Sequence, residues 1–222
     1  MKIENIKACV FDAYGTLFDV NSAAAKCKEK LGSKWEGFAN AWRTTQLEYT
    51  WLRSLMKKHK NFWEITEDSL DHSMETFKIK KEMRNELLDL YKKLSSYPEV
   101  EECLKNLKDK NIKIAILSNG TPDLLKKLVE SNNIQNYFDD ILSIESVGVY
   151  KPDSKVYEMP IKKYDCKPEN ICFMSSNTWD VSGGGVFGYN AIWVNRFNKV
   201  FDKLSYKPKF VINNLKELLE II

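Results

Sequence analysis

This sequence contains few histidines and no closely spaced pair of cysteines. Among its 222 residues the histidines are His59 and His72, both within charged helical stretches and neither beside a serine or cysteine nucleophile. We therefore expect no histidine-dependent triad and no histidine-rich metal site, and we interpret both side chains as solvent-facing helix residues. The five cysteines include no Cys-x-x-Cys pair, and their odd number without a targeting segment predicts reduced thiols in a cytoplasmic protein.

Long hydrophobic runs and a concentration of charge of one sign are also missing. No apolar stretch approaches the ~18 residues that a membrane-spanning helix needs, so we expect no membrane contact. The 34 basic and 31 acidic residues are scattered and leave a net charge of +3. This balance predicts no nucleic acid partner and is compatible with a small anionic substrate. The length of 222 residues suits one core with a substantial insertion.

The chain does contain a regular alternation of short apolar segments with helical stretches, from residue 97 onward. This alternation predicts an α/β protein with a doubly wound, parallel, Rossmann-like sheet. Residues 20–95 instead show helical apolar spacing, so we divide the chain into a core, 1–19 and 96–222, and an inserted helical cap, 20–95. The predicted strands are residues 6–11, 112–117, 141–143, 171–174, 191–194 and 210–212.

Local signals refine the predicted helices of the core. Thr121 and Asp153 are predicted N-caps, because each precedes a helical stretch. Pro160 lies within the second of these helices and is expected to kink it, unless the helix ends early. Residues 183–188 fit the dinucleotide-binding pattern Gly-x-Gly-x-x-Gly. They lie too far beyond the preceding strand for that role, so close helix packing is the preferred interpretation.

Polar residues follow three of the predicted strands at the same expected edge of the sheet. Asp12 follows the first strand, Ser118 and Asn119 follow the second, and residues 175–177 follow the strand that begins at residue 171. The carboxyl edge of an open α/β sheet is where ligands bind. Each group alone is commonly a turn or a helix cap, but the three together predict a functional site.

The segment from Phe11 to Asp19 resembles the first motif of the haloacid dehalogenase superfamily, in which a strand-end aspartate is the nucleophile. Tyr14 stands two residues after Asp12, where a phosphate-transferring member carries a second acid. This variant resembles the L-2-haloacid dehalogenases. Matching motifs cover nearly the whole chain, at residues 42–43, 46–56, 149–153, 156–158, 175–177 and 179–180.

Three features depart from the pattern of the L-2-haloacid dehalogenases. Thr44 stands where a glutamine is expected, Thr178 stands where small residues are usual, and Gly184-Gly185 make the following helix unusually rich in glycine. These departures concern the substrate range and not the class of reaction.

The resemblance implies a role for each matched residue. Asp12 is the nucleophile, Lys151 keeps it ionised, and Arg43 receives the halide. Asp180 positions water, and Ser118 binds the substrate carboxylate together with backbone amides. The implied catalytic residues are Asp12, Arg43, Lys151, Ser175, Asn177 and Asp180. The residues implied to bind substrate or orient their neighbours are Tyr14, Thr16, Leu47, Phe62, Ser118, Asn119, Tyr157 and Trp179.

The implied reaction is hydrolysis of (S)-2-haloalkanoic acids to (R)-2-hydroxyalkanoic acids in two steps. Asp12 displaces the halide from C2 with inversion and forms an ester, and water then attacks the carbonyl of that ester. A halide leaves without a proton, whereas the alkoxide that leaves a phosphoryl group needs an acid where Tyr14 stands. Ser175 and Ser176 occupy the place of the superfamily's metal-binding acids, so we expect no metal and no cofactor.

Two alternatives remain open. A Mg²⁺-dependent small-molecule phosphatase of the same superfamily would need its missing acid and metal ligands from elsewhere in the chain. A non-catalytic binding module would keep the fold without needing Asp12, Arg43, Lys151 and Asp180 together. The resemblance also implies a homodimer, to which the cap helix around residues 49–52 contributes. The expected partners are therefore a small 2-haloacid, water, the halide product and a second copy of the chain.

Overall fold

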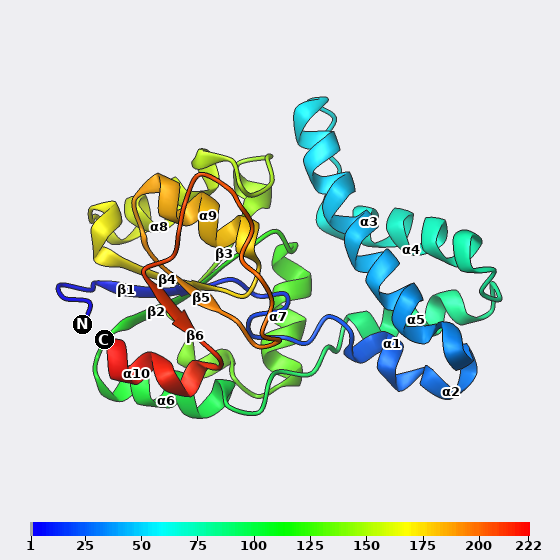
Figure 1. Ribbon diagram of the computed structural model, residues 1–222, viewed down its shortest axis with the longest axis horizontal. Helices are drawn as coiled ribbons and strands as arrows, with labels where there is room; N and C mark the ends of the chain where they lie inside the picture. Colours follow the sequence, from blue (N-terminus) through cyan, green and yellow to red (C-terminus); the bar gives the residue numbers. More distant parts are fainter. Residues whose placement is uncertain (1) are drawn as a thin grey trace.

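The computed structural model, which describes residues 2–222, contains a six-stranded sheet in the order β3-β2-β1-β4-β5-β6 (Figure 1). All neighbouring strands in the sheet are parallel. The strands are β1 Ala8–Phe11, β2 Lys113–Ser118, β3 Asp140–Ser143, β4 Ile171–Ser175, β5 Asn190–Val194 and β6 Phe210–Ile212. The order reverses at β1, where a crevice for ligands is expected. The predicted α/β class is confirmed, and each strand begins and ends within two residues of its prediction.

Helices cover both faces of the sheet, which explains why the central strands are apolar along their whole length. Every residue of β1 and of β4 is buried. The helices α8 (Ser154–Tyr164) and α9 (Thr178–Phe187) lie over one face, and α6 (Val100–Asp109) and α10 (Leu218–Ile221) lie over the other (Figure 1). Strands buried on both faces lose the polar alternation of a half-exposed sheet. The helix α7 (Pro122–Ser131) follows β2 and contacts β3.

The cap consists of helices between β1 and α6 and lies beside the carboxyl edge of the sheet (Figure 1). Its longest helix, α3, packs along α4. The α3 residues Phe38, Trp42, Gln46 and Thr50 are buried at intervals of four, as expected for one face of an amphipathic helix. The cap helices are α1 Ser22–Lys26, α2 Lys28–Leu31, α3 Trp35–Leu55, α4 Phe62–Phe77 and α5 Met83–Tyr91.

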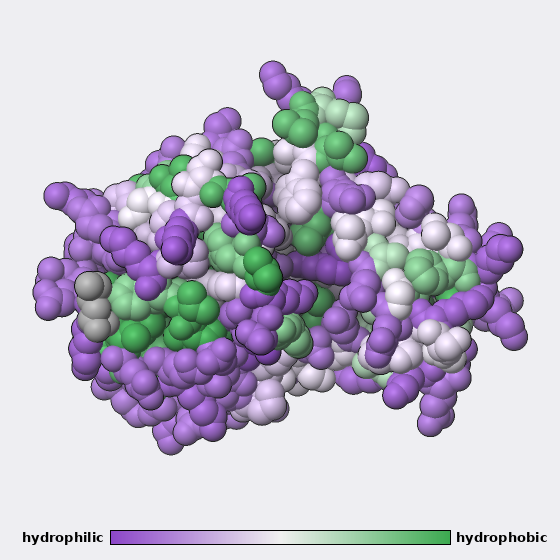
Figure 2. Space-filling view, in the orientation of Figure 1, coloured by the Kyte–Doolittle hydropathy of each residue, from purple (hydrophilic) through white to green (hydrophobic). Residues whose placement is uncertain are grey.

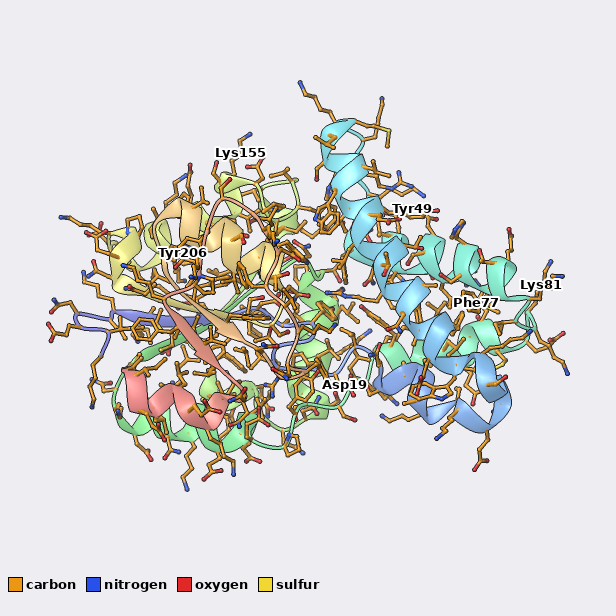
Figure 3. All side chains as sticks on the ribbon, in the orientation of Figure 1. Asp19, Tyr49, Phe77, Lys81, Lys155 and Tyr206 are labelled. Carbon is orange, nitrogen blue, oxygen red and sulfur yellow. The ribbon has the colours of Figure 1, made fainter. Side chains whose placement is uncertain are left out.

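The two segments that join the cap to the core run side by side. Phe18 and Ser96 form an antiparallel bridge, and the backbone N–H of Asp19 donates to the carbonyl of Ser95 at 2.8 Å. Asp19 is labelled in Figure 3 at this crossing. The chain therefore leaves the core and returns to it at one place, which is the geometry that an inserted segment requires.

The predicted helix starts are confirmed, and the alternative of an early end at Pro160 is wrong. The Thr121 side chain accepts a hydrogen bond from the backbone of Leu124, and that of Asp153 accepts one from Lys155. The helix α8 continues past Pro160 to Tyr164. Pro160 removes one backbone hydrogen bond, but its ring is buried, so packing stabilises the helix around it.

The glycines of α9 allow close packing, as predicted. A Cβ atom at Gly183 would meet the Tyr157 hydroxyl at 2.5 Å, and one at Gly184 would meet the Phe173 ring at 2.8 Å. Gly185 lies against the ring of Tyr206, which is labelled in Figure 3. Only glycine allows α9 to approach its neighbours this closely, which supports the packing interpretation over a dinucleotide site.

Both histidines are exposed, as predicted, but His72 alone of the two lies in a helix. His72 lies exposed on α4. His59 lies in the turn after α3, where its Nε2 is 2.9 Å from a carboxylate oxygen of Glu145 and its ring stacks on that of Tyr150. The turn brings a cap residue against the core, a long-range contact that the local charge pattern does not reveal. Among residues 2–222, no helix has the length and apolar character to cross a membrane.

Candidate active site

Asp12 lies directly after β1, between β2 and β4 in the centre of the sheet. Its backbone N–H donates to the carbonyl of Met174 at 2.9 Å, which continues the β1–β4 ladder by one residue. The side chain emerges at the carboxyl edge, and the residue is 5% exposed. The predicted convergence of strand ends is therefore centred on this carboxylate.

The two oxygens of the Asp12 carboxylate have different surroundings. Oδ2 accepts hydrogen bonds from Asn177 Nδ2 at 2.8 Å and from Thr16 Oγ1 at 3.0 Å. The Ser175 hydroxyl lies 3.5 Å from the same oxygen. Oδ1 instead faces the ammonium of Lys151 at 3.3 Å. Neutral donors thus hold one oxygen in place, while the other is paired with a cation.

Lys151 lies between two buried carboxylates. Its Nζ atom is 2.8 Å from Asp180 Oδ2, and both side chains are fully buried. The Tyr157 hydroxyl donates to the other Asp180 oxygen at 2.7 Å. Burial raises the pKa of Asp180 to about 6, although the nearby Lys151 ammonium opposes the shift. Asp180 therefore binds a proton more tightly than an ordinary aspartate does.

The polar side chains at the end of β2 accept hydrogen bonds from nearby backbone N–H groups. The Ser118 hydroxyl accepts a hydrogen bond from the backbone of Gly120 at 3.1 Å. Asn119 Oδ1 accepts one from the backbone N–H of Lys151 at 3.1 Å. Both residues are buried at the expected edge of the sheet. Asn119 therefore positions the Lys151 segment, and the predicted contact of Ser118 with a substrate carboxylate stays a prediction.

A cavity of about 370 Å³ lies between the cap and the core, within the usual size range of small-ligand pockets. Its lining includes Arg43 and Leu47 from α3, and Tyr14, Asn177 and Trp179 from the core. The cavity brings the cap residues predicted from the sequence next to Asn177, which contacts the Asp12 carboxylate. The cap and the core thus build one site together.

Phe62 lies behind Tyr14. It is 1% exposed, and its ring centroid is 5.1 Å from that of Tyr14. On another side Tyr14 stacks with Tyr91 at 5.9 Å. Burial raises the pKa of Tyr14 well above its ordinary value, so the phenol stays neutral at physiological pH. Tyr14 therefore contributes a neutral aromatic surface at the position where phosphate-transferring relatives carry an acid.

Two polar residues support the site beyond those predicted. The Ser176 backbone N–H donates to Thr16 Oγ1 at 2.8 Å and orients the hydroxyl that binds Asp12. Gln46, one helical turn after Arg43, accepts a hydrogen bond from the Arg43 guanidinium at 2.9 Å. Ser176 belongs to a strand-end segment that the sequence singles out. For Gln46, the sequence signals are its helical spacing from Arg43 and its place at the start of the matching motif of residues 46–56.

The acidic residues of the site already have a cation. The Lys151 ammonium lies between the carboxylates of Asp12 and Asp180. Among residues 2–222, no group of three or more histidine, cysteine, aspartate or glutamate side chains has the arrangement of a metal site. The Lys151 ammonium therefore serves as the ionic partner of both buried carboxylates.

The fold and the site define a class of protein, and comparisons with known proteins agree. Residues 6–188 match the haloacid dehalogenase-like hydrolase family. The chain is 39% identical to (S)-2-haloacid dehalogenase 1 of Pseudomonas sp. strain CBS-3, over 99% of this chain and 98% of that protein. It is 40% identical to the (S)-2-haloacid dehalogenase of Pseudomonas fluorescens, over 97% of this chain and 96% of that one.

A solved structure agrees as well. The L-2-haloacid dehalogenase from Xanthobacter autotrophicus with chloropropionic acid covalently bound superimposes with a TM-score of 0.90 at 31% identity, covering 97% of each chain. The chain therefore belongs to the haloacid dehalogenase-like hydrolases and, within them, to the L-2-haloacid dehalogenases.

Proposed function

We propose that this protein hydrolyses (S)-2-haloalkanoic acids to (R)-2-hydroxyalkanoic acids, with Asp12 as the nucleophile. The observation that carries the proposal is the asymmetry of the Asp12 carboxylate. Three neutral side chains surround Oδ2, and Oδ1 faces Lys151. This arrangement suits a carboxylate that attacks with one oxygen while the other stays in place. The relative with chloropropionic acid covalently bound supports an intermediate of this kind.

In the first step, Asp12 Oδ1 attacks C2 of the substrate from the side opposite the halogen. The new C–O bond forms as the carbon–halogen bond breaks, and the halide leaves with the bonding electrons. Attack from the rear inverts C2. Alignment of this kind contributes about 7–11 kcal/mol to such reactions. Arg43 lines the cavity from the cap and is placed to receive the negative charge that develops on the halide.

In the second step, water attacks the carbonyl carbon of the Asp12 ester. The carbonyl oxygen is then Oδ2, and its donors Asn177 and Thr16 stabilise the negative charge that develops there, as in an oxyanion hole. Asp180 takes a proton from the water and returns it to Oδ1 as the bond between the carbonyl carbon and Oδ1 breaks. This releases the (R)-2-hydroxy acid with Oδ1, and loss of the second water proton to solvent restores Asp12 as a carboxylate.

The remaining site residues are proposed to hold the substrate and its surroundings. Ser118 binds the substrate carboxylate with nearby backbone amides, and Leu47 and Trp179 contact the alkyl chain from the cavity wall. Tyr157 acts through its hydrogen bond to Asp180. Asn119 acts through its bond to the Lys151 backbone. Residues 20–95 form the cap that covers this cavity, and residues 1–19 with 96–222 form the catalytic core.

The test is halide release from each enantiomer of 2-chloropropionate in EDTA, with a phosphate-ester assay in Mg²⁺ run in parallel. Release from the (S) form alone is expected. Ester cleavage that needs Mg²⁺, without halide release, would favour the phosphatase alternative, and silence in both assays would favour the binding module. A single turnover in ¹⁸O-water should label Asp12, whereas label in the product alone would reject the ester intermediate.

We propose, further, that the protein is a homodimer whose interface includes the projecting end of α3. Leu52, Leu55 and Met56 are 50%, 79% and 59% exposed there, and Figure 2 shows hydrophobic side chains gathered at this end. Exposed apolar patches commonly mark interfaces. Sedimentation equilibrium should give the mass of two chains, and Leu55→Glu should shift the protein toward one chain. We also propose that the protein is located in the cytoplasm, because its five cysteines are free thiols.

A further inference from the structure

Arg43 differs from the other arginines of the chain in its partner. Arg53 is paired with the carboxylate of Asp68, Arg84 with that of Asp71, and Arg196 with that of Glu99. The hydrogen-bond partner of Arg43 within residues 2–222 is the side-chain amide oxygen of Gln46, at 2.9 Å. A carboxylate partner would neutralise most of the guanidinium charge, whereas an amide leaves that charge in place.

The amide of Gln46 is held in one orientation. Its Nε2 donates to Thr66 Oγ1 at 2.7 Å and to the Tyr91 hydroxyl at 3.0 Å. The Thr66 hydroxyl donates to the Phe62 carbonyl at 2.7 Å, so its oxygen is free to accept from Gln46. Arginine has no acceptor and can only donate. The amide oxygen must therefore face Arg43, and the amide nitrogen must face α4 and α5.

This network is buried and joins three helices of the cap. Gln46 is 1% exposed, Thr66 is fully buried, and Tyr91 is 3% exposed. They come from α3, α4 and α5. Burying an amide without partners costs free energy, but both polar atoms of Gln46 are bonded here. The network is rigid behind Arg43, which itself is half-buried on the cavity wall.

We propose that Gln46 is a positioning residue for Arg43. It fixes the guanidinium at the cavity through a neutral acceptor, so that the charge of Arg43 stays available to the departing halide. This inference rests on the proposed function, in which Arg43 receives the halide. Gln46 acts in the first step, ester formation, and has no part in ester hydrolysis, which takes place on the core residues around Asp12.

The test compares Gln46→Glu with Gln46→Met. Gln46→Glu has the same shape but places a carboxylate against Arg43, and Gln46→Met removes the acceptor. Hydrogen bonds to charged groups set the scale, so we expect Gln46→Glu to slow ester formation by about 10- to 100-fold. Halide inhibition should weaken by a similar factor, and Gln46→Met should have a smaller effect. The rate of ester hydrolysis should stay that of the unmodified protein.

The measurements are the single-turnover rates of halide release and of ester decay, together with chloride binding followed by chlorine NMR line broadening. Gln135→Glu is the control. It adds the same charge at an exposed site and should change neither of the two rates nor chloride binding. If Gln46→Glu fails to fold by circular dichroism, the same measurements are made on Gln46→Met and on Thr66→Val, which removes one of the two acceptors of the Gln46 amide nitrogen.

Two outcomes would overturn the inference. Folded Gln46 variants with unchanged ester formation and chloride binding would show that Gln46 only packs. An equal slowing of both steps would show a general structural role. If the unmodified protein releases no halide from (S)-2-chloropropionate, the proposed function fails. Chloride binding then tests the Gln46–Arg43 relation separately: loss of binding in Gln46→Glu supports it, and unchanged binding rejects it.

Discussion

The charged side chains of the site have different partners in the core and in the cap. In the core, the charges of Asp12, Lys151 and Asp180 alternate, and the three residues are 5%, 1% and 0% exposed. In the cap, Arg43 is half-buried and bonded to a neutral amide. Buried charges need partners of opposite sign, whereas a cation on a cavity wall does not. Each buried core charge therefore has an ionic partner before a substrate arrives, whereas the Arg43 charge on the cap side has none within residues 2–222 and is left for the substrate.

The strongest test of this contrast is Asp12→Asn, because it removes the nucleophile from the core half of the site. An amide oxygen is a poor nucleophile, so turnover should fall by on the order of 10⁴-fold or more. Halide release from (S)-2-chloropropionate measures the loss. Asp123→Asn, on the exposed surface of α7, is the matched control and should keep full activity. Activity that persists in folded Asp12→Asn would mean that another residue is the nucleophile.

Asp180→Asn separates the two steps on the core side. The variant keeps the pairing of Lys151 with Asp12 but loses the base that activates water. Ester hydrolysis should slow by about 10²- to 10⁴-fold, while ester formation continues. A burst of one halide per site should therefore be followed by slow release, and intact-protein mass spectrometry should detect the ester. Absence of a burst and of the ester would place Asp180 in the first step instead.

Arg43→Lys tests the cap side. Lysine keeps the charge but loses the planar group that Gln46 orients. We expect ester formation to slow by about 10- to 100-fold, the scale of a hydrogen bond to a charged group, with ester hydrolysis unchanged. Rapid-quench measurement of both steps checks this. Arg84→Lys, which alters an ion pair on α5 away from the cavity, serves as the control. If ester hydrolysis is also slower in Arg43→Lys, Arg43 does not act in ester formation alone, and this proposal is wrong.

The smallest expected effect is a pH dependence of ester hydrolysis. In the free protein, burial and, in part, the negative charge of Asp12 raise the pKa of Asp180 to about 6. The Asp12 ester is neutral, so the pKa of Asp180 is lower in the ester, and the rate should fall about tenfold per unit below that pKa. The same shift affects stability. The folded state holds the Asp180 proton more tightly than the unfolded state does. The Asp180 contribution to the free energy of unfolding should therefore decrease as pH rises from 3.8 to about 6.

Two measurements check the pH prediction. The decay rate of the isolated ester should follow a single titration at a pH below the Asp180 pKa of the free protein, and ester formation should not follow it. Urea unfolding of the unmodified protein and of Asp180→Asn should show a difference in stability that changes between pH 3.8 and about 6. A rate of ester decay that does not fall at low pH, in protein that stays folded, would rule out Asp180 as the base.

Local sequence patterns determined much of this protein. Short apolar segments predict all six strands, most clearly β1 and β4, which are buried on both faces and must be apolar throughout. The polar residues after those strands predict the convergence at Asp12, because parallel strands end at one edge of the sheet. Thr121 and Asp153 predict helix starts because an N-cap acts within three residues. Pro160 shows the limit of such patterns, since α8 continues past it to Tyr164 although the proline cannot donate a backbone hydrogen bond.

Only the tertiary structure decided which atoms meet. Lys151 pairs with Asp12 across 139 positions of sequence, and its second partner is Asp180. That Oδ1 rather than Oδ2 of Asp12 faces Lys151, and that a neutral amide holds Arg43, depends on contacts between distant elements. Local propensity acts over one or two turns of chain, whereas side-chain charge balance and orientation are set by packing between segments. The sequence therefore determines the kinds of groups in the site, and the fold determines how each is used.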